Sequence, residues 1–312
     1  MTAKSVLVTG ASGMIGTALI ERLHGDGYDV TGVDVEPNRW SDVVADLTVR
    51  ADLLDDAVGE ALPEDVDVLV HLAANARVHR LVNNPRRARD NFEMTFNVLE
   101  YVRQAGVSQV VFGSSREVYG NKGKIVYSEE DTYVDECESP YTASKVGGEA
   151  MLKAYEQCYD MHASILRFSN VYGRFDVSDR VLPLFIAQAH DGQDLTVYGD
   201  DKVLDFTYLD DCVDGIVRVI EKFHKAKGTT FNIASGEGTS LIELAEEIAR
   251  RVDTDVDIHV EPNRTGEVGR YVADISKANK VLNYDPAYSF NEGLDAAVDW
   301  YMTNPRFFDE IR

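Results

Sequence analysis

The sequence has little positive charge. Only 31 of its 312 residues are Lys or Arg, against 54 Asp or Glu, and the formal net charge is −23. Nucleic acids and anionic membranes attract basic surfaces through their phosphate groups. The charge balance therefore excludes both as main partners. Hydrophobic residues make up 44% of the chain, which is enough for a sizeable core and argues against global disorder.

Lysine, cysteine and long apolar runs are also scarce. Eleven Lys stand against twenty Arg, and 32 Asp against 22 Glu, a composition that predicts a halophilic protein whose charge repulsion is screened by salt. The three cysteines have no CxxC spacing, which argues against a disulfide framework. The histidines show no ligand grouping, so we expect no metal. No apolar run reaches 18 residues, so we expect no membrane span and a cytoplasmic protein.

The first 172 residues alternate short apolar runs with helical patterns. Strands are expected at 5–9, 29–35, 43–45, 67–72, 109–113 and 164–168, and helices at 14–24, 50–62, 88–105 and after Pro140. This alternation predicts an α/β fold with a Rossmann-like, doubly wound parallel sheet. Residues 173–312 have shorter, mixed segments and are expected to form a smaller, interleaved α/β lobe, with about 205–235 returning to the sheet.

A glycine-rich turn follows the first expected strand. The motif is GxxGxxG, and its members are Gly10, Gly13, Met14, Ile15 and Gly16. Glycines at this spacing allow a tight turn, close approach of the backbone to a pyrophosphate, and close helix packing. The positive end of the next helix then faces the phosphates. Between a strand and a helix, the motif predicts a dinucleotide site.

Acidic and small residues at later strand ends complete this cofactor site. Asp34 ends the second strand, where a carboxylate accepts bonds from ribose hydroxyls and repels a 2′-phosphate, so NAD is expected over NADP. Asp46 and Leu47 are expected to contact the adenine. Asp52 offers the same dipeptide but falls in the expected helix 50–62. Small side chains at Leu72–Ala73–Ala74 leave room for the cofactor backbone.

Tyr141 and Lys145 lie four residues apart in the segment SPYTASK. Ser139 suits a helix N-cap and Pro140 the first helical position, so both side chains should share one helix face. A free Tyr has a pKa of about 10, too high for a base at neutral pH. A neighbouring ammonium and a nicotinamide cation would both lower that pKa. Tyr141 is therefore expected to accept a substrate proton, assisted by Lys145.

Four ordered motifs give the chain a specific resemblance. TGASGMIG, GSSREVYG, YTASK and RFSNVYG occur in this order. The chain resembles extended short-chain dehydrogenase/reductases, and most of all the NAD-dependent nucleotide-sugar epimerase/dehydratase family, which includes UDP-galactose 4-epimerases. The similarity covers nearly the whole chain, to RTGE at 264–267 and beyond.

The resemblance implies further site residues. Ser115 would hydrogen-bond the substrate 4-hydroxyl, with Ser114 beside it. Asn91 would support the active-site helix, and Phe168 would lie near the nicotinamide. The remaining implied substrate contacts are Asn170, Leu182, Tyr198, Arg264 and Glu267.

Two departures from the family pattern keep the reaction open. Epimerases resemble Ser-Ala-Thr-Val-Tyr-Gly where this chain has Ser115-Arg116-Glu117. Glu117 is typical of dehydratases and decarboxylases and indicates a further general base. Arg116 fits none of these patterns and would either pair with Glu117 or attract a substrate carboxylate. Leu204 stands where an Arg usually grips the diphosphate, and Lys202 is a candidate replacement.

These residues predict an NAD-dependent 4-epimerase of the UDP-glucose/UDP-galactose type, acting through a 4-keto intermediate. The alternatives are a 4,6-dehydratase or a UDP-glucuronate decarboxylase and, more remotely, a non-catalytic NAD sensor. The expected partner is a UDP-linked nucleotide sugar. Apolar residues on 88–105 and 144–158 favour a homodimer.

Overall fold

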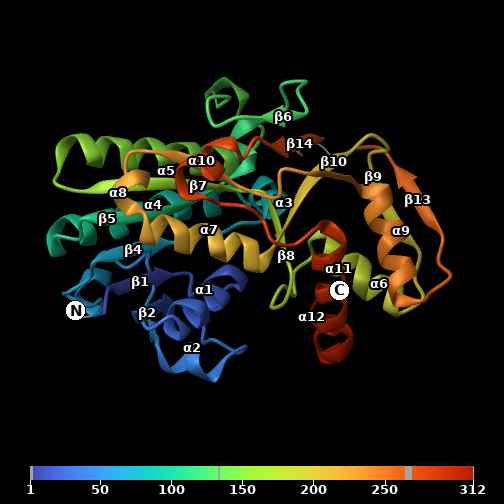
Figure 1. Cartoon of the computed structure of the whole chain (residues 1–312), viewed down its shortest axis with the longest axis horizontal. Coiled ribbons are helices and arrows are strands. Elements are labelled where there is room, and N and C mark those ends of the chain that lie inside the picture. Colours follow the sequence, from blue (N-terminus) through green and yellow to red (C-terminus); the bar gives the residue numbers. More distant parts are fainter. Residues whose placement is uncertain (1–2, 133, 264–268, 312) are drawn as a thin grey trace.

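The computed structural model describes residues 3–132, 134–263 and 269–311. In this part of the chain the main sheet has seven parallel strands in the order β11-β7-β5-β4-β1-β2-β3. The strands are β1 (Ser5–Thr9), β2 (Asp29–Asp34), β3 (Thr48–Arg50), β4 (Val68–His71), β5 (Gln109–Ser115), β7 (His162–Phe168) and β11 (Thr230–Ile233). The predicted doubly wound sheet is confirmed, and the carboxyl ends of its strands point toward the second lobe (Figure 1).

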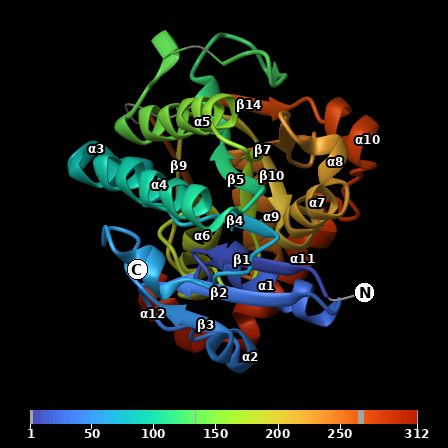
Figure 2. The ribbon, with the colours of Figure 1, turned by 90° about the vertical axis from the view of Figure 1, so that its left-hand side faces the viewer.

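Helices cover both faces of this sheet (Figure 2). One face carries α1 (Met14–Gly25) and α7 (Leu209–Glu221), and the other carries α4 (Arg86–Ala105) and α5 (Pro140–Cys158). Successive side chains of a strand point to opposite faces. Val6 and Val8 accordingly pack with α1 and α7, while Leu7 packs with α4 and α5. Burial on both faces explains why these strands are apolar throughout.

The second lobe lies on the right of Figure 1 and has its own core. Its larger sheet runs β12-β10-β14-β6, with β8 beside β10, and β9 pairs with β13. The strands are β6 (Val126–Tyr127), β8 (Asn170–Tyr172), β9 (Leu195–Tyr198), β10 (Val203–Tyr208), β12 (Gly238–Ser240), β13 (Ile258–Glu261) and β14 (Arg270–Ala273). The chain leaves this lobe through α7 and rejoins the main sheet at β11, beside β7.

The other helices are shorter or belong to the second lobe. They are α2 (Asp42–Asp46), α3 (Val78–Asn83), α6 (Val181–His190), α8 (Phe223–Ala226), α9 (Leu241–Val252), α10 (Ser276–Leu282), α11 (Phe290–Thr303) and α12 (Phe308–Ile311). Single 3-10 turns occur at Val58–Ala61, Arg116–Tyr119, Val134–Glu136 and Pro305–Phe307. Among the described helices, none is long and apolar enough to cross a membrane.

Two predicted elements near the cofactor edge are wrong. Residues 43–45, expected as a strand, lie inside α2, and the third strand is β3 at Thr48–Arg50. The expected helix 50–62 is mostly irregular and keeps only the 3-10 turn Val58–Ala61. Its acidic residues explain this, because Asp52 and Asp55 each accept a bond from the N–H two residues on. Such local turns compete with helix formation.

Candidate active site

The glycine turn joins β1 to α1 at the carboxyl edge of the sheet. Gly10 has φ +75°, and a Cβ there would lie 2.8 Å from the backbone N of Ala73, so the loops after β1 and β4 approach closely only because this residue is glycine. A Cβ on Gly16 would lie 2.1 Å from the carbonyl oxygen of Gly10. Gly13 is exposed, and no side chain caps the start of α1. The N–H groups at the start of α1 therefore suit a pyrophosphate. The side chains of Met14 and Ile15 in this turn are half-buried.

Asp34 lies beside this turn at the end of β2. Its carboxylate accepts bonds from the N–H groups of Ser12 and Glu36, both at 2.9 Å. The side chain is only partly exposed and is held in place from both sides. It therefore occupies the position expected for the ribose contact. Ser12 was not predicted, because no motif distinguishes it within the turn.

The structure separates the two candidates for the adenine contact. Asp46 and Leu47 precede β3 and so lie at the amino end of this parallel strand, away from the glycine turn. Asp52 follows β3 and lies at the carboxyl end, where the cofactor edge is. The preference for Asp46 depended on a helix at 50–62 that does not form, and the placement favours Asp52.

Tyr141 and Lys145 project from the first turns of α5. Ser139 caps the helix by accepting the N–H of Thr142 at 3.1 Å, and Pro140 begins it, as predicted. The side chain of Ser115 lies close enough to the Tyr141 hydroxyl to lower its pKa. Lys145 donates to the carbonyl oxygen of Gly113 at 2.8 Å, and its ammonium lies 5.1 Å from the ring centre of Phe112. All of these groups lie at the carboxyl edge of β5.

Burial has the largest effect on the pKa of Tyr141. It raises the pKa of Tyr141 above its usual value, and the charge of Glu117 adds to the effect. The side chain of Ser115 and the charges of Arg180 and Arg116 act in the opposite direction. The prediction that Lys145 brings the pKa of Tyr141 below its usual value is therefore wrong for the chain by itself.

The pKa of Lys145 is also perturbed. Burial lowers it to about 8, against the opposing charge of Glu149. Lys145 in turn helps burial to lower the pKa of His71 to about 3, so His71 is neutral at physiological pH. His71 bonds Thr9 at 2.7 Å and Thr95 at 3.3 Å. It is a buried structural residue behind the site, as expected.

A buried ion pair lies next to Lys145, one helical turn further along α5. Arg167 binds Glu149 through two bonds, at 3.0 and 2.7 Å. Ser114 donates to the same carboxylate at 2.5 Å, so its hydroxyl is directed into this network. Sequence reasoning missed Glu149 and Arg167. The spacing of Lys145 and Glu149, one helical turn apart, was the available signal.

Arg116 and Glu117 form a second buried pair near Tyr141. Their side chains are 11% and 8% exposed, and Arg116 Nη2 lies 2.9 Å from Glu117 Oε1. Arg116 Nε also donates to Asn170 at 3.2 Å. Within the described residues, Arg116 Nη1 and Glu117 Oε2 are buried without a hydrogen-bond partner. The pairing of Arg116 with Glu117, one of the two predicted options, is thus present. It leaves one donor of Arg116 and one acceptor of Glu117 without a partner.

The other predicted residues lie at the cofactor edge, in the second lobe or outside the described residues. Asn91 binds the backbone of Asn75 and donates to Ser144 at 3.0 Å, so it braces α5 against the loop after β4, which contains Leu72, Ala73 and Ala74. Phe168 ends β7 at this same edge, 8% exposed. Leu182 is buried in the core of the second lobe, and Tyr198 ends β9 there. Arg264 and Glu267 lie outside the described residues.

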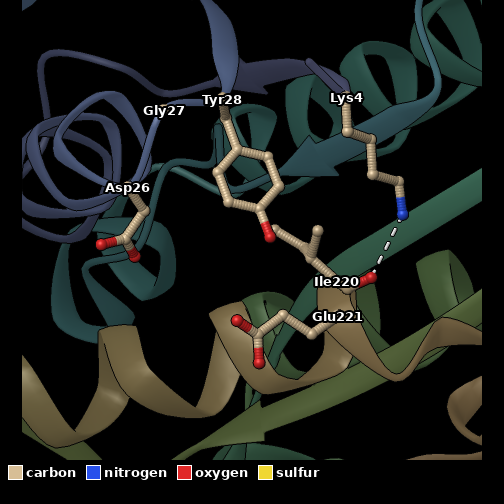
Figure 3. Close-up of a pocket in the computed structure, with 6 residues that line it drawn as sticks. All are labelled: Lys4, Asp26, Gly27, Tyr28, Ile220 and Glu221. Carbon is tan, nitrogen blue, oxygen red and sulfur yellow. Dashed lines mark hydrogen bonds between the residues drawn. The ribbon is translucent and has the colours of Figure 1, made fainter. Parts of the chain in front are cut away.

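A separate hollow lies away from this site. It has a volume of about 470 Å³ and lies at the amino ends of β1 and β2, between Tyr28 and the end of α7 (Figure 3). Lys4 in its wall donates to the carbonyl oxygen of Ile220 and to Gln109, while Asp26 and Glu221 add two acids. Ligands of parallel α/β sheets bind at the opposite, carboxyl edge.

Known proteins share this architecture. The model of the NAD dependent epimerase/dehydratase family matches residues 6–234. The UDP-glucose 4-epimerase of Mycolicibacterium smegmatis is 35% identical, over 95% of this chain and 97% of its own. The structure of a Thermotoga maritima UDP-glucose 4-epimerase with UDP-glucose matches with a TM-score of 0.88 and 28% identity, over 96% and 99% of the two chains. A Bacillus cereus UDP-glucuronic acid 4-epimerase, solved with UDP-glucuronic acid and NAD, matches at 0.87 and 28%, with the same coverage.

Proposed function

This chain belongs to the NAD dependent epimerase/dehydratase family, and from that premise we propose that it is a nucleotide-sugar 4-epimerase of the UDP-glucose/UDP-galactose type. It is an NAD-dependent sugar-nucleotide enzyme. The proposed reaction inverts C4 of the sugar through a 4-keto intermediate. The observation that carries the proposal is the grouping of Ser115, Tyr141 and Lys145 at the carboxyl edge of β5, with Lys145 one helical turn from Tyr141.

The glycine turn, Asp34 and Lys145 would hold NAD. The exposed face of Gly13 and the uncapped start of α1 suit its pyrophosphate, and Asp34 suits its adenosine ribose. Lys145 uses one of its three donors on Gly113 and has others for the second ribose. When bound, NAD supplies the acceptor for the C4 hydride and afterwards its donor.

Tyr141 moves the proton in this scheme. Its hydroxyl oxygen accepts the proton of the sugar 4-hydroxyl during oxidation and gives it back during reduction, so the enzyme ends unchanged. Ser115 would orient both hydroxyl groups, because its side chain lies close to the Tyr141 hydroxyl. The charges of Arg116 and Arg180 favour the phenolate form and offset part of the effect of burial. A positioned acid–base group of this kind contributes roughly 10²–10⁴ in rate.

A second candidate function is supported by Glu117. A 4,6-dehydratase or a UDP-glucuronate decarboxylase needs chemistry beyond C4, and a buried carboxylate with an unused oxygen beside Tyr141 is suited to it. The ion pair with Arg116 favours the epimerase instead, because it engages one oxygen of Glu117. A chain with Ser-Ala-Thr at positions 115–117 would have small, uncharged side chains in place of this ion pair.

Product analysis separates these functions. The purified enzyme with NAD is incubated in turn with UDP-glucose, UDP-galactose, UDP-glucuronate and dTDP-glucose. We expect interconversion of UDP-glucose and UDP-galactose without loss of water or carbon dioxide. A 4-keto-6-deoxy sugar or a UDP-pentose would establish the second candidate, and four unchanged sugars would refute both.

Replacing Tyr141 tests the catalytic assignment. Tyr141→Phe keeps the ring that packs against Leu81 and removes only the hydroxyl, so the fold and bound NAD should be retained. We expect kcat to fall by about 10²–10⁴, because the proton acceptor is lost. Thermal unfolding and NAD content by absorbance provide the controls. Turnover at the wild-type rate would show that another group takes the proton.

A further inference from the structure

A pocket of about 290 Å³ opens beside Tyr141 and is lined by arginines. Arg77 precedes α3, Arg87 lies in the first turn of α4, and Arg180 precedes α6, so three separate elements converge on it. Leu81 forms part of its wall and packs in the same apolar cluster as Tyr141. The charge of Arg180 also acts on the Tyr141 hydroxyl. The pocket is therefore contiguous with the proposed catalytic site.

The hydrogen-bond donors of the arginines in this pocket are incompletely satisfied. Arg77 lies 4.0 Å from Asp176 and 3.5 Å from Asp179, and Arg180 lies 3.7 Å from Asp176. Charge-assisted hydrogen bonds are about 2.7–2.9 Å long, so these acids balance charge without satisfying the donors. In the part of the chain that is described, Arg77 Nη1 is buried and has no hydrogen-bond partner. Burial and the charges of Arg180 and Arg80 lower the pKa of Arg77 to about 10.

Such a pocket is unexpected on this chain. The net charge is −23, yet three arginines line one small pocket. A buried donor without a partner costs stability, on the order of 1–3 kcal/mol, and is retained where a ligand satisfies it. Guanidinium groups match the paired oxygens of phosphates and carboxylates. Among the described residues, Asp176 Oδ2 is likewise buried without a hydrogen-bond partner. An anion that reaches Arg77 Nη1 would supply the acceptor that Asp176 does not.

We infer that Arg77 and Arg180 bind anionic oxygens of the nucleotide-sugar substrate in this pocket. The inference rests on the proposed function, and it explains how the chain manages without a cation at Leu204. That residue is 6% exposed on β10 and packs in the apolar core of the second lobe, so it offers nothing to a diphosphate. Two groups of a nucleotide sugar have the required chemistry, the diphosphate and the carboxylate of a uronic acid.

Titration calorimetry with NAD-loaded enzyme tests the inference and separates the two sources. UDP, UDP-glucose and UDP-glucuronate are titrated into the wild type, Arg77→Gln and Arg180→Gln. We expect the Kd to rise about tenfold or more in each variant, as for loss of a desolvated charge contact. An equal rise for all three ligands identifies the diphosphate. A rise confined to UDP-glucuronate identifies a sugar carboxylate.

Arg80→Gln is the matched control. Arg80 lies on α3 close to Arg77 and binds the same Asp179 at 3.2 Å, but it is 56% exposed and does not line the pocket. Its Kd values should stay within about twofold of the wild type. Thermal midpoints identify any variant that fails to fold, and Arg77→Lys, which keeps the charge but loses the planar fork, then replaces Arg77→Gln.

Three results would overturn the inference. Unchanged Kd values in both pocket variants, with normal wild-type binding, refute it and leave the proposed function intact. Loss of bound NAD with unchanged UDP-sugar affinity would mean that the pocket serves the cofactor. A wild-type enzyme that binds none of the three ligands refutes the proposed function, and this inference with it.

Discussion

Lys145 gives the proposed reaction a pH limit. Burial lowers its pKa to about 8, so it is mostly cationic at pH 7 and becomes neutral above pH 8. A neutral amine has no charge and one donor fewer for Gly113 and the cofactor ribose. We therefore expect kcat/KM to decrease above pH 8, by about tenfold per unit well beyond the pKa. A pH profile of purified enzyme with saturating NAD measures this directly.

Lys145→Arg provides the control for that profile. A guanidinium stays charged to pH 12 and beyond, so the residual activity of this variant should not decrease between pH 8 and 10. An identical decrease in both enzymes would assign the titration to another group. The lowered pKa of Lys145 also affects the stability of the fold, with the opposite dependence on pH. Because the pKa of Lys145 is lower in the folded chain, its burial costs stability below pH 8, and this cost disappears as the pH rises toward 10.5.

Glu117 discriminates between the candidate reactions. Glu117→Gln keeps the shape of the side chain but removes its basicity. An epimerase should keep kcat within about tenfold, whereas a dehydratase or decarboxylase should lose about 10²–10⁴ as its general base disappears. In either case Arg116 loses its countercharge, and the free energy of unfolding should fall by about 1–3 kcal/mol.

Glu93→Gln is a suitable control for this stability effect. It removes an acid paired with Arg89 on the surface of α4, where the Arg is 79% exposed. Exposed pairs of this kind contribute less than about 1 kcal/mol. A Glu117→Gln enzyme as stable as Glu93→Gln would contradict the buried ion pair.

At the scale of elements, the corrected cofactor edge makes a prediction about Asp52. Asp52 follows β3 at the edge where the glycine turn and Asp34 lie, whereas Asp46 precedes it. We expect Asp52→Ala to weaken NAD binding by about 1–2 kcal/mol, or roughly 5–30-fold in Kd, through loss of one charged hydrogen bond. Asp46→Ala is the matched control and should bind NAD normally. The reverse result would restore the first assignment.

This edge also shows which elements the sequence predicts well. Long, strongly patterned elements such as α4 and α5 were located to within a few residues, because apolar periodicity, Ser139 and Pro140 all indicate the same boundaries. The segment 43–62 was wrong because two signals conflicted. Val43, Val44 and Val49 favour strands locally, while the spacing from Leu53 to Leu62 is helical. Asx turns at Asp52 and Asp55 decide the outcome, and periodicity does not detect them.

The site was predictable where one motif contains its residues and not where the fold assembles them. Ser115, Tyr141 and Lys145 lie in recognisable motifs, and Asp34 ends the next strand after the glycine-rich turn. Arg77 and Arg180 are about a hundred positions apart and meet only because the loop after β4 faces the start of α6. No pattern along the chain could associate them. The buried pair of Glu149 and Arg167 was missed for the same reason, since it joins α5 to β7.

For the molecule as a whole, the net acidic charge coexists with cationic or donor-rich features at the ligand edge. The arginine pocket and the uncapped start of α1 are local positive regions on a chain of net charge −23. This arrangement allows an acidic protein to bind an anionic substrate. The halophilic origin of this charge stays a prediction. The homodimer expected from α4 and α5 stays a prediction, with Phe96 of α4, 47% exposed, as a candidate contact.

The net charge finally predicts a dependence on salt. Exposed ion pairs contribute less than about 1 kcal/mol each and are weakened by salt, whereas the repulsion among unbalanced acids is relieved by it. With 54 acidic against 31 basic residues, relief of repulsion should dominate. We expect the thermal midpoint and the activity both to rise between 0.1 and about 3 M KCl, where the Debye length falls below about 3 Å. Sucrose, which favours compact states without screening charge, separates the two effects. Full stability and activity in dilute buffer would remove the halophilic assignment without affecting that of Tyr141, because screening acts on the surface and the Tyr141 site is buried.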